Sequence, residues 1–108
     1  MTSDLNLIRG TVDLLVLKAI SREARHGYAI SQWIKGVTRG ELLVEEGSLY
    51  PALHRIERKG WISADWGVSE TGRRARFYQL TDEGRERLAH ELRTWERYSE
   101  AIRAALGA

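Results

Sequence analysis

Apolar residues in the first half of the chain recur at the three- and four-residue spacing of amphipathic helices. From Arg9 to Ser21 a first predicted helix is apolar on most of its circumference, so it needs cover on two sides, from the rest of the chain or from a second subunit. The polar, glycine-ended stretch from Arg22 to Gly27 predicts a turn. A second helix is predicted from about His26 to Val37, with Tyr28 on its polar outer face. Leu42 to Val44 then fits either a short strand or an extended connection.

The stretch between residues 45 and 61 predicts a third helix. Leu49, Leu53 and Ile56 are spaced at i, i+4 and i+7, so one side of this helix is committed to a core. Pro51 must lie in or near the first turn, where its missing amide hydrogen costs little. We therefore expect the helix to start between Glu46 and Ser48.

The other side of the third helix is polar. It presents hydroxyl, imidazole and guanidinium groups, which are the types that reach phosphates and base edges in a DNA groove. These side chains are Ser48, Tyr50, His54, Arg55 and Arg58. The ordinary alternative is a solvated helix face, since runs of charge usually keep a surface wet.

Beyond Gly60 the pattern changes from the period of a helix to that of a strand. Alternating apolar and polar residues predict two strands, at Trp61–Trp66 and Arg76–Leu80. The segment between them is too polar to pack and carries Arg73 and Arg74 on its second limb. It predicts a hairpin with a basic tip.

The last quarter of the chain predicts one long helix, from about Asp82 to Leu106, capped by Thr81. Its apolar positions are spaced by alternating fours and threes, as in the seam of a coiled coil. They include Leu88, Leu92, Trp95, Ile102 and Leu106. The rest of the chain is too small to cover the far end of such a helix, so we expect the seam to form a dimer interface with a second copy.

Taken in order, these elements predict a mainly α fold with a small β hairpin: three helices, a basic-tipped hairpin and a long final helix. This is the order of a winged helix-turn-helix, in which the third helix enters the major groove and the hairpin tip leans on a phosphate or the minor groove. We expect residues 1–80 to form the DNA-binding domain and residues 81–108 to form a C-terminal dimerisation helix, both within one structural unit.

Composition narrows the classes of function. The 108 residues include no cysteine, which excludes disulfides, thiolate nucleophiles and Cys-based metal sites and fits a reducing compartment. The formal net charge is only +2, so a nucleic-acid partner must be argued from where the basic residues lie. The longest nearly apolar run, Leu14–Ile20, is interrupted by Lys18 and too short for a membrane span, and the first residues do not resemble a signal peptide. We expect a cytoplasmic protein with no membrane partner.

No pattern predicts catalysis. The 3 histidines fall on different predicted helices, and the pair formed by Glu86 and His90 lacks further metal ligands. There is no Ser-His-acid arrangement, phosphate-binding glycine loop or carboxylate pair in a predicted cleft. We therefore expect no enzymatic activity, no metal and no cofactor.

Three segments resemble the PadR family of winged-helix transcriptional regulators. They are GYAI at residues 27–30, EGSLYPALHRIERKGWI at residues 46–62 and GRRARFYQLTDEGRERL at residues 72–88. The resemblance covers nearly the whole chain, and the second and third segments are specific in combination. With a single helix after the hairpin, the chain resembles the short form of the family.

The resemblance implies a homodimeric repressor that binds an inverted-repeat, pseudo-palindromic operator and is released by a small-molecule signal or a partner. It implies that DNA is contacted by the third helix and by the hairpin, which is the wing of this fold, and we add one residue of the second helix. The residues that we expect to contact DNA are Tyr28, Ser48, Tyr50, His54, Arg55, Arg58, Arg73, Arg74 and Arg76. In multidrug-sensing short members, a tryptophan at the dimer interface stacks on flat aromatic ligands, and Trp95 resembles it. Ordinary dimer core is the alternative interpretation of Trp95.

Two other functions stay open. The chain could be a winged-helix protein-interaction module in which the face from Ser48 to Arg58 docks a partner chain and DNA is irrelevant. An apolar patch on that face would favour this interpretation, and the sequence shows none. The other interpretation keeps DNA binding but omits effector sensing, so that the last helix serves only as a dimer clamp.

Overall fold

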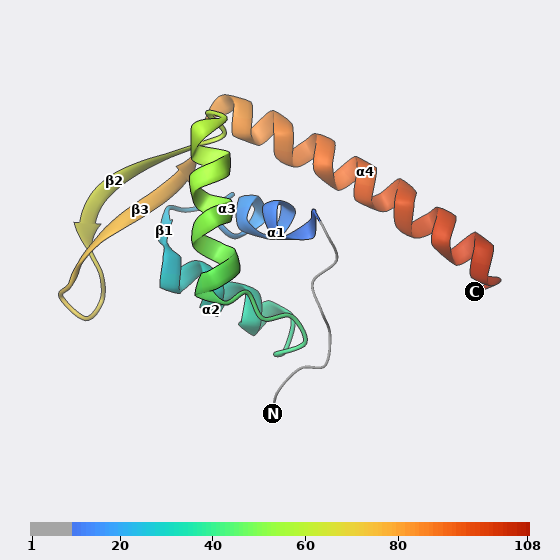
Figure 1. Ribbon diagram of the computed structural model, residues 1–108, viewed down its shortest axis with the longest axis horizontal. Coiled ribbons are helices and arrows are strands. Elements are labelled where there is room, and N and C mark those ends of the chain that lie inside the picture. The colour runs from blue at the N-terminus through green and yellow to red at the C-terminus, as the bar shows by residue number, and fades with distance from the viewer. Residues whose placement is uncertain (1–9) are drawn as a thin grey trace.

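The computed structural model describes residues 10–108 as a winged helix from which one long helix projects (Figure 1). In chain order the elements are α1 (Thr11–Ala19), β1 (Arg25–His26), α2 (Gly27–Val37), α3 (Glu46–Arg58), β2 (Ile62–Val68), β3 (Arg74–Leu80) and α4 (Asp82–Leu106). The predicted fold class is confirmed. Arg9, expected at the start of the first helix, and the first residues, which were compared with a signal peptide, lie outside the described residues.

Two helices begin where a side chain caps their first turn. The Nδ1 atom of His26 accepts a hydrogen bond from the backbone N–H of Ala29 at 3.2 Å, at the start of α2. Thr81 Oγ1 accepts from the N–H of Gly84 at 3.0 Å, at the start of α4. Both caps satisfy backbone donors that have no partner within the helix. The predicted cap at Thr81 is confirmed.

α3 begins at Glu46, within the predicted range. Pro51 lies early in the second turn, near the first turn as predicted, so the carbonyl of Gly47 lacks its usual helical donor. This end of α3 is exposed at both Gly47 and Pro51, and solvent can therefore satisfy that carbonyl.

The segment before α2 differs from the prediction. Residues 22–27 were expected to form a turn, but Arg25 and His26 form strand β1, which pairs antiparallel with β3 opposite Tyr78 and Phe77. The sheet of the described chain therefore has 3 strands in the order β1-β3-β2. Two residues are too few to show the alternation that identifies a strand in a sequence.

The first helix is shorter than predicted, and the connection before α3 is not a strand. Gly10 has φ 89°, in the left-handed region that favours glycine, and α1 starts directly after it. Residues 42–45 have no regular secondary structure, so the extended connection is the correct alternative. It is held to α2 by the Ser31 hydroxyl, which donates to the carbonyl of Val44 at 2.9 Å.

The hydrophobic core lies where α1, α2 and α3 meet. Its fully buried side chains come from all three helices and include Leu17, Ile30, Ile34, Leu53 and Ile56. Burying each one stabilises the fold by about 1.5–3 kcal/mol. The three α3 residues predicted to face a core are buried. α1 is contacted by α2, α3 and α4, which provides the cover on two sides that its apolar circumference requires.

The hairpin is longer than predicted. β2 and β3 pair from Ile62 opposite Leu80 to Val68 opposite Arg74, so Arg74 belongs to a strand and the tip is residues 69–73. Inside the tip, the N–H of Ser69 donates to the carbonyl of Arg73 at 2.8 Å, and the N–H of Gly72 donates to the carbonyl of Ser69 at 2.9 Å. Figure 1 shows the hairpin extending away from the three-helix core, on the side opposite α4.

The predicted bounds of α4 are confirmed, and its apolar positions divide into two groups. Leu88, which the sequence pattern assigns to the seam, is half-buried and packs against the core of its own chain. Farther along, the side chains are exposed in the single chain: Leu92, Trp95, Tyr98, Ile102 and Leu106. No helix in residues 10–108 is long and apolar enough to cross a membrane.

The junction between the hairpin and α4 generates a stability prediction. A Cβ atom on Gly84 would lie 1.9 Å from the backbone oxygen of Trp61, which has no room to move because it accepts a hydrogen bond from the Thr81 N–H at 3.1 Å. We expect Gly84→Ala to lower the free energy of unfolding by about 3 kcal/mol in urea denaturation. Gly36→Ala is the matched control, because a Cβ there meets nothing within 4 Å and should stabilise α2 by about 0.4–1 kcal/mol. Equal effects of the two substitutions would contradict this packing.

Candidate nucleic-acid interface

A hollow of about 780 Å³ lies between the helices and the hairpin. One wall is formed by the start of α2 and the first turns of α3, and the opposite wall by the hairpin and its tip. Most of the residues predicted to contact DNA line this hollow: Tyr28, Tyr50, His54, Arg73, Arg74 and Arg76. The fold therefore brings two segments that are separate in the sequence into one surface.

Tyr50 is placed by a close approach between α2 and α3. A Cβ atom on Gly27 would lie 2.7 Å from the Tyr50 hydroxyl oxygen, so the phenol packs where Gly27 has no side chain. Tyr50 still exposes 40% of its surface and Tyr28 exposes 68%. His54, one turn after Tyr50 on α3, is also exposed. These side chains present two phenols and an imidazole along the helical wall.

Two of the predicted arginines are engaged by acids of their own chain. The guanidinium of Arg55 forms an ion pair with Asp13 of α1, outside the hollow. The guanidinium of Arg76 lies 2.9 Å from a carboxylate oxygen of Glu57 and 5.7 Å from the centre of the Tyr78 ring. The sequence pattern predicts that both arginines contact DNA but gives no sign of these two acidic partners.

Ser48 and Arg58 are exposed but lie outside the main hollow. Arg58 lines a smaller hollow of about 300 Å³ together with His54 and Arg76, farther along α3. The polar surface therefore continues along α3 past the main hollow.

Trp66 also lines the hollow, although the sequence pattern predicts no role for it in the site. It exposes 60% of its surface, and the guanidinium of Arg74 lies 4.3 Å from the centre of its ring. Such cation–π contacts stabilise by about 0.5–1 kcal/mol at exposed sites. The register explains the contact, because Trp66 pairs with Arg76, and Arg74 lies two residues away on the same face of the sheet. His26 and Glu70 line the hollow as well and were not predicted.

Tyr78 forms the inner end of the hollow. Burial raises the pKa of its phenol above the ordinary value, Arg76 acts in the opposite direction, and Glu57 and Tyr50 raise the pKa further. The phenol therefore stays protonated at neutral pH and can donate a hydrogen bond.

Within residues 10–108, no three histidine, aspartate or glutamate side chains are placed to hold a metal ion together.

The fold and this surface define a winged-helix protein with a polar, arginine-rich face between its third helix and its hairpin. Residues 16–90 match the transcriptional regulator PadR-like family, and the chain belongs to this family. The resemblance in its sequence motifs is thereby confirmed.

Known relatives agree with this assignment. A transcriptional regulator of Mycobacterium tuberculosis is 33% identical over 99 residues, which cover 92% of this chain and 86% of the relative. The solved structure of a transcriptional regulator from Clostridium thermocellum is 32% identical, with a TM-score of 0.82 over 90% of this chain and 94% of that chain. A PadR-like transcriptional regulator from Bacillus cereus is 29% identical, with a TM-score of 0.78 over 93% of this chain and 95% of that chain.

Proposed function

We propose that this transcriptional regulator is a sequence-specific DNA-binding repressor that acts as a homodimer on a pseudo-palindromic operator. One observation carries the proposal: the polar side of α3 and the arginines of the hairpin border the same hollow. A duplex seated there would meet the recognition helix and the wing at the same time.

The placement of side chains along α3 supports this docking. In helix-turn-helix proteins the first turns of the recognition helix contact base edges. Ser48, Tyr50 and His54 occupy the first three turns of α3 and are exposed. Arg73 and Arg74 are exposed at the end of the hairpin, where guanidinium groups can bind phosphate oxygens.

The ion pairs of Arg55 and Arg76 do not remove these residues from DNA binding. The side chain of Arg55 is 49% exposed and that of Arg76 is 38% exposed. Surface ion pairs of this kind stabilise by at most about 1 kcal/mol. Either guanidinium can therefore exchange its carboxylate partner for a phosphate or for a guanine edge, at little cost.

The exposed side of α3 favours DNA over a protein partner. Among residues 10–108, Tyr50 is the one large hydrophobic side chain exposed on this helix. Protein-binding surfaces centre on larger apolar patches. The protein-interaction alternative therefore gains no support from this face.

The exposed seam of α4 supports the homodimer. Leu92, Ile102 and Leu106 expose 43%, 41% and 75% of their surfaces, along a helix that extends beyond the rest of the chain (Figure 1). A second copy would cover these side chains and would relate two α3 helices by a two-fold axis. A dimer bound across an operator can repress by excluding other proteins from that DNA.

A second hollow suggests how an effector would act. It measures about 440 Å³ and lies between α1 and α4, where Leu14, Trp95 and Tyr98 line it. The rings of Trp95 and Tyr98 have centroids 6.3 Å apart. We infer that a small planar aromatic effector binds against Trp95 and releases DNA by altering the packing of the seam.

The dimer and its operator are tested by selecting duplexes that the full chain retains from a random pool. We expect enrichment of an inverted repeat whose half-sites lie roughly 10 base pairs apart, or a multiple of this spacing. The mass of the complex should correspond to two chains on each enriched duplex. This enriched duplex is the operator. Enrichment of an unrepeated site by a single chain would contradict the dimer, and no enrichment at all would contradict sequence-specific binding.

The wing is tested by the salt dependence of operator affinity, measured by fluorescence anisotropy. We expect the double variant Arg73→Ala, Arg74→Ala to lower the slope of log affinity against log salt by about one for each phosphate that the wing no longer binds. Arg55→Ala is the comparison. If Arg55 reads a base, its removal should weaken binding to the operator by roughly 1–3 kcal/mol and should change binding to scrambled DNA little. An unchanged slope would remove the wing from the interface, and equal losses on both duplexes would assign Arg55 to a phosphate.

The effector site is tested by titrating planar aromatic compounds while following tryptophan emission. We expect a binding compound to quench the wild-type protein saturably and to release the operator, because it stacks on Trp95. Trp95→Ala should abolish both effects, whereas Trp66→Phe, which removes an exposed tryptophan of the hairpin, should keep the quenching. Quenching that survives Trp95→Ala would place the ligand elsewhere.

A further inference from the structure

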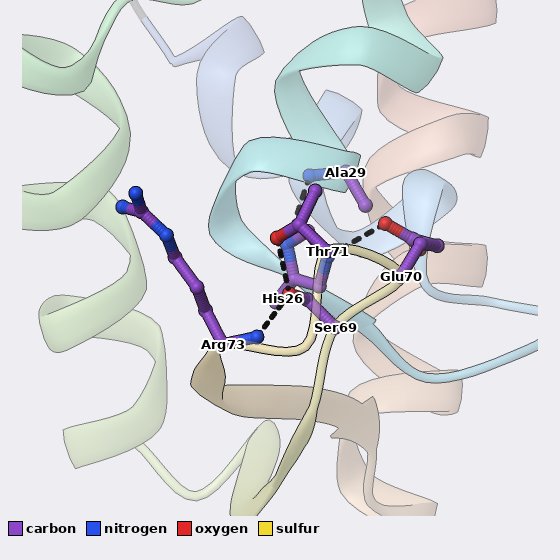
Figure 2. A network of polar contacts seen from close by, with 6 residues as sticks. All are labelled: His26, Ala29, Ser69, Glu70, Thr71 and Arg73. Atoms are coloured by element: carbon purple, nitrogen blue, oxygen red, sulfur yellow. Dashed lines mark hydrogen bonds and ion pairs between the residues drawn. The ribbon is translucent and has the colours of Figure 1, made fainter.

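The tip of the wing turns back towards the start of α2, where Glu70 faces His26 (Figure 2). A carboxylate oxygen of Glu70 lies 3.7 Å from His26 Nε2. His26 is the cap of α2, and Glu70 belongs to the tip formed by residues 69–73. This approach brings the wing tip to the helix that packs against α3.

The orientation of the His26 ring is fixed by two contacts. Its Nδ1 atom accepts a hydrogen bond from the Ala29 N–H at 3.2 Å, so this nitrogen carries no proton while the cap is intact. The proton of the neutral ring is therefore on Nε2. The ring also packs edge-on against Phe77 of β3, with centroids 5.2 Å apart. Together the cap and the aromatic contact aim the Nε2–H donor at the wing tip.

This donor is buried and has no hydrogen-bond partner among the described residues. His26 is only 7% exposed, and an unpaired buried donor is unfavourable. Glu70 supplies the facing acceptor, and a hydrogen bond needs the two atoms at about 2.9 Å. Because the Glu70 side chain is 81% exposed, it is free to make this small movement.

Glu70 is linked to Arg73 through the turn that they share. The Arg73 N–H donates to Ser69 Oγ at 3.3 Å, and the hydroxyls of Ser69 and Thr71 are 3.0 Å apart (Figure 2). The Ser69 N–H in turn donates to the Arg73 carbonyl at 2.8 Å. Glu70 and Arg73 therefore belong to one hydrogen-bonded turn, so docking Glu70 on His26 constrains where the backbone of Arg73 lies.

We propose that Glu70 is a positioning residue for DNA binding. It docks on His26 and holds the wing tip in a fixed position relative to α3. In that position Arg73 can contact a phosphate while α3 lies in the major groove. The inference rests on the proposed DNA-binding function.

If Glu70 acts only through its negative charge, its removal should change DNA affinity in the opposite direction. A solvated carboxylate on a DNA-facing surface repels phosphates, so its removal alone would tighten binding to any duplex. Removal of a positioning residue would instead weaken binding to the operator. The direction of the effect therefore separates the two roles.

The test measures operator affinity for Glu70→Ala and Glu70→Gln, with Asp65→Asn as the control for lost charge. Asp65 is an exposed acid of β2 with no polar partner in the described chain. We expect Glu70→Ala to weaken operator binding roughly three- to tenfold, the equivalent of about one hydrogen bond. Glu70→Gln keeps an acceptor oxygen and should restore binding to within about twofold of wild type. Asp65→Asn should bind at least as tightly as wild type.

Hydrogen exchange of the free protein provides a measurement that does not depend on DNA. We expect the tip amides of Gly72 and Arg73 to exchange faster in Glu70→Ala than in wild type or in Asp65→Asn. Operator binding by Glu70→Ala that is unchanged or tighter, with unchanged exchange of the tip, would overturn the proposal. A wild-type chain that binds no duplex would refute the proposed function instead, and the exchange would still show whether Glu70 fixes the tip.

Discussion

The architecture depends on the close approach of three elements at the start of α2. His26 caps this helix, pairs with β3 through the backbone and packs its ring on Phe77. Gly27, the next residue, leaves room for the Tyr50 phenol of α3. Two adjacent residues therefore fix α3 and the hairpin relative to one another. Any protein that binds one duplex with both a helix and a hairpin needs this rigidity, because two elements that move independently cannot hold their contacts to the same DNA.

A second constraint acts at the start of α4. Gly84 packs against the carbonyl of Trp61, and Thr81 both caps α4 and donates from its hydroxyl to the Gly60 carbonyl at 2.6 Å. The direction of α4 is thereby set by the turn that follows α3. If α4 pairs with a second copy, its direction also sets the spacing between two recognition helices. The hollow beside Trp95 lies between α1 and this same helix, so a molecule bound there would contact the helix whose direction is set in this way.

The elements with a strong local signal were predictable from the sequence. The buried side of α3 is identified by Leu49, Leu53 and Ile56, because the period of a helix can be detected within a short stretch of sequence. The ion pairs between Arg55 and Asp13 and between Arg76 and Glu57 were not predictable, because they join separate elements whose relative placement the sequence does not encode locally. Strand β1 is too short to show a period, and the contact of Trp66 with Arg74 depends on a hairpin register fixed only on folding.

The central claim is that α3 and the wing contact one duplex together, and hydroxyl-radical oxidation of the full chain tests it most directly. Exposed aromatic side chains report on each wall of the hollow: Tyr28 and Tyr50 on the helices and Trp66 on the hairpin. The account predicts that the operator slows oxidation on both walls at the same DNA concentration, while scrambled DNA has little effect. Protection of one wall alone, or of neither, would contradict it.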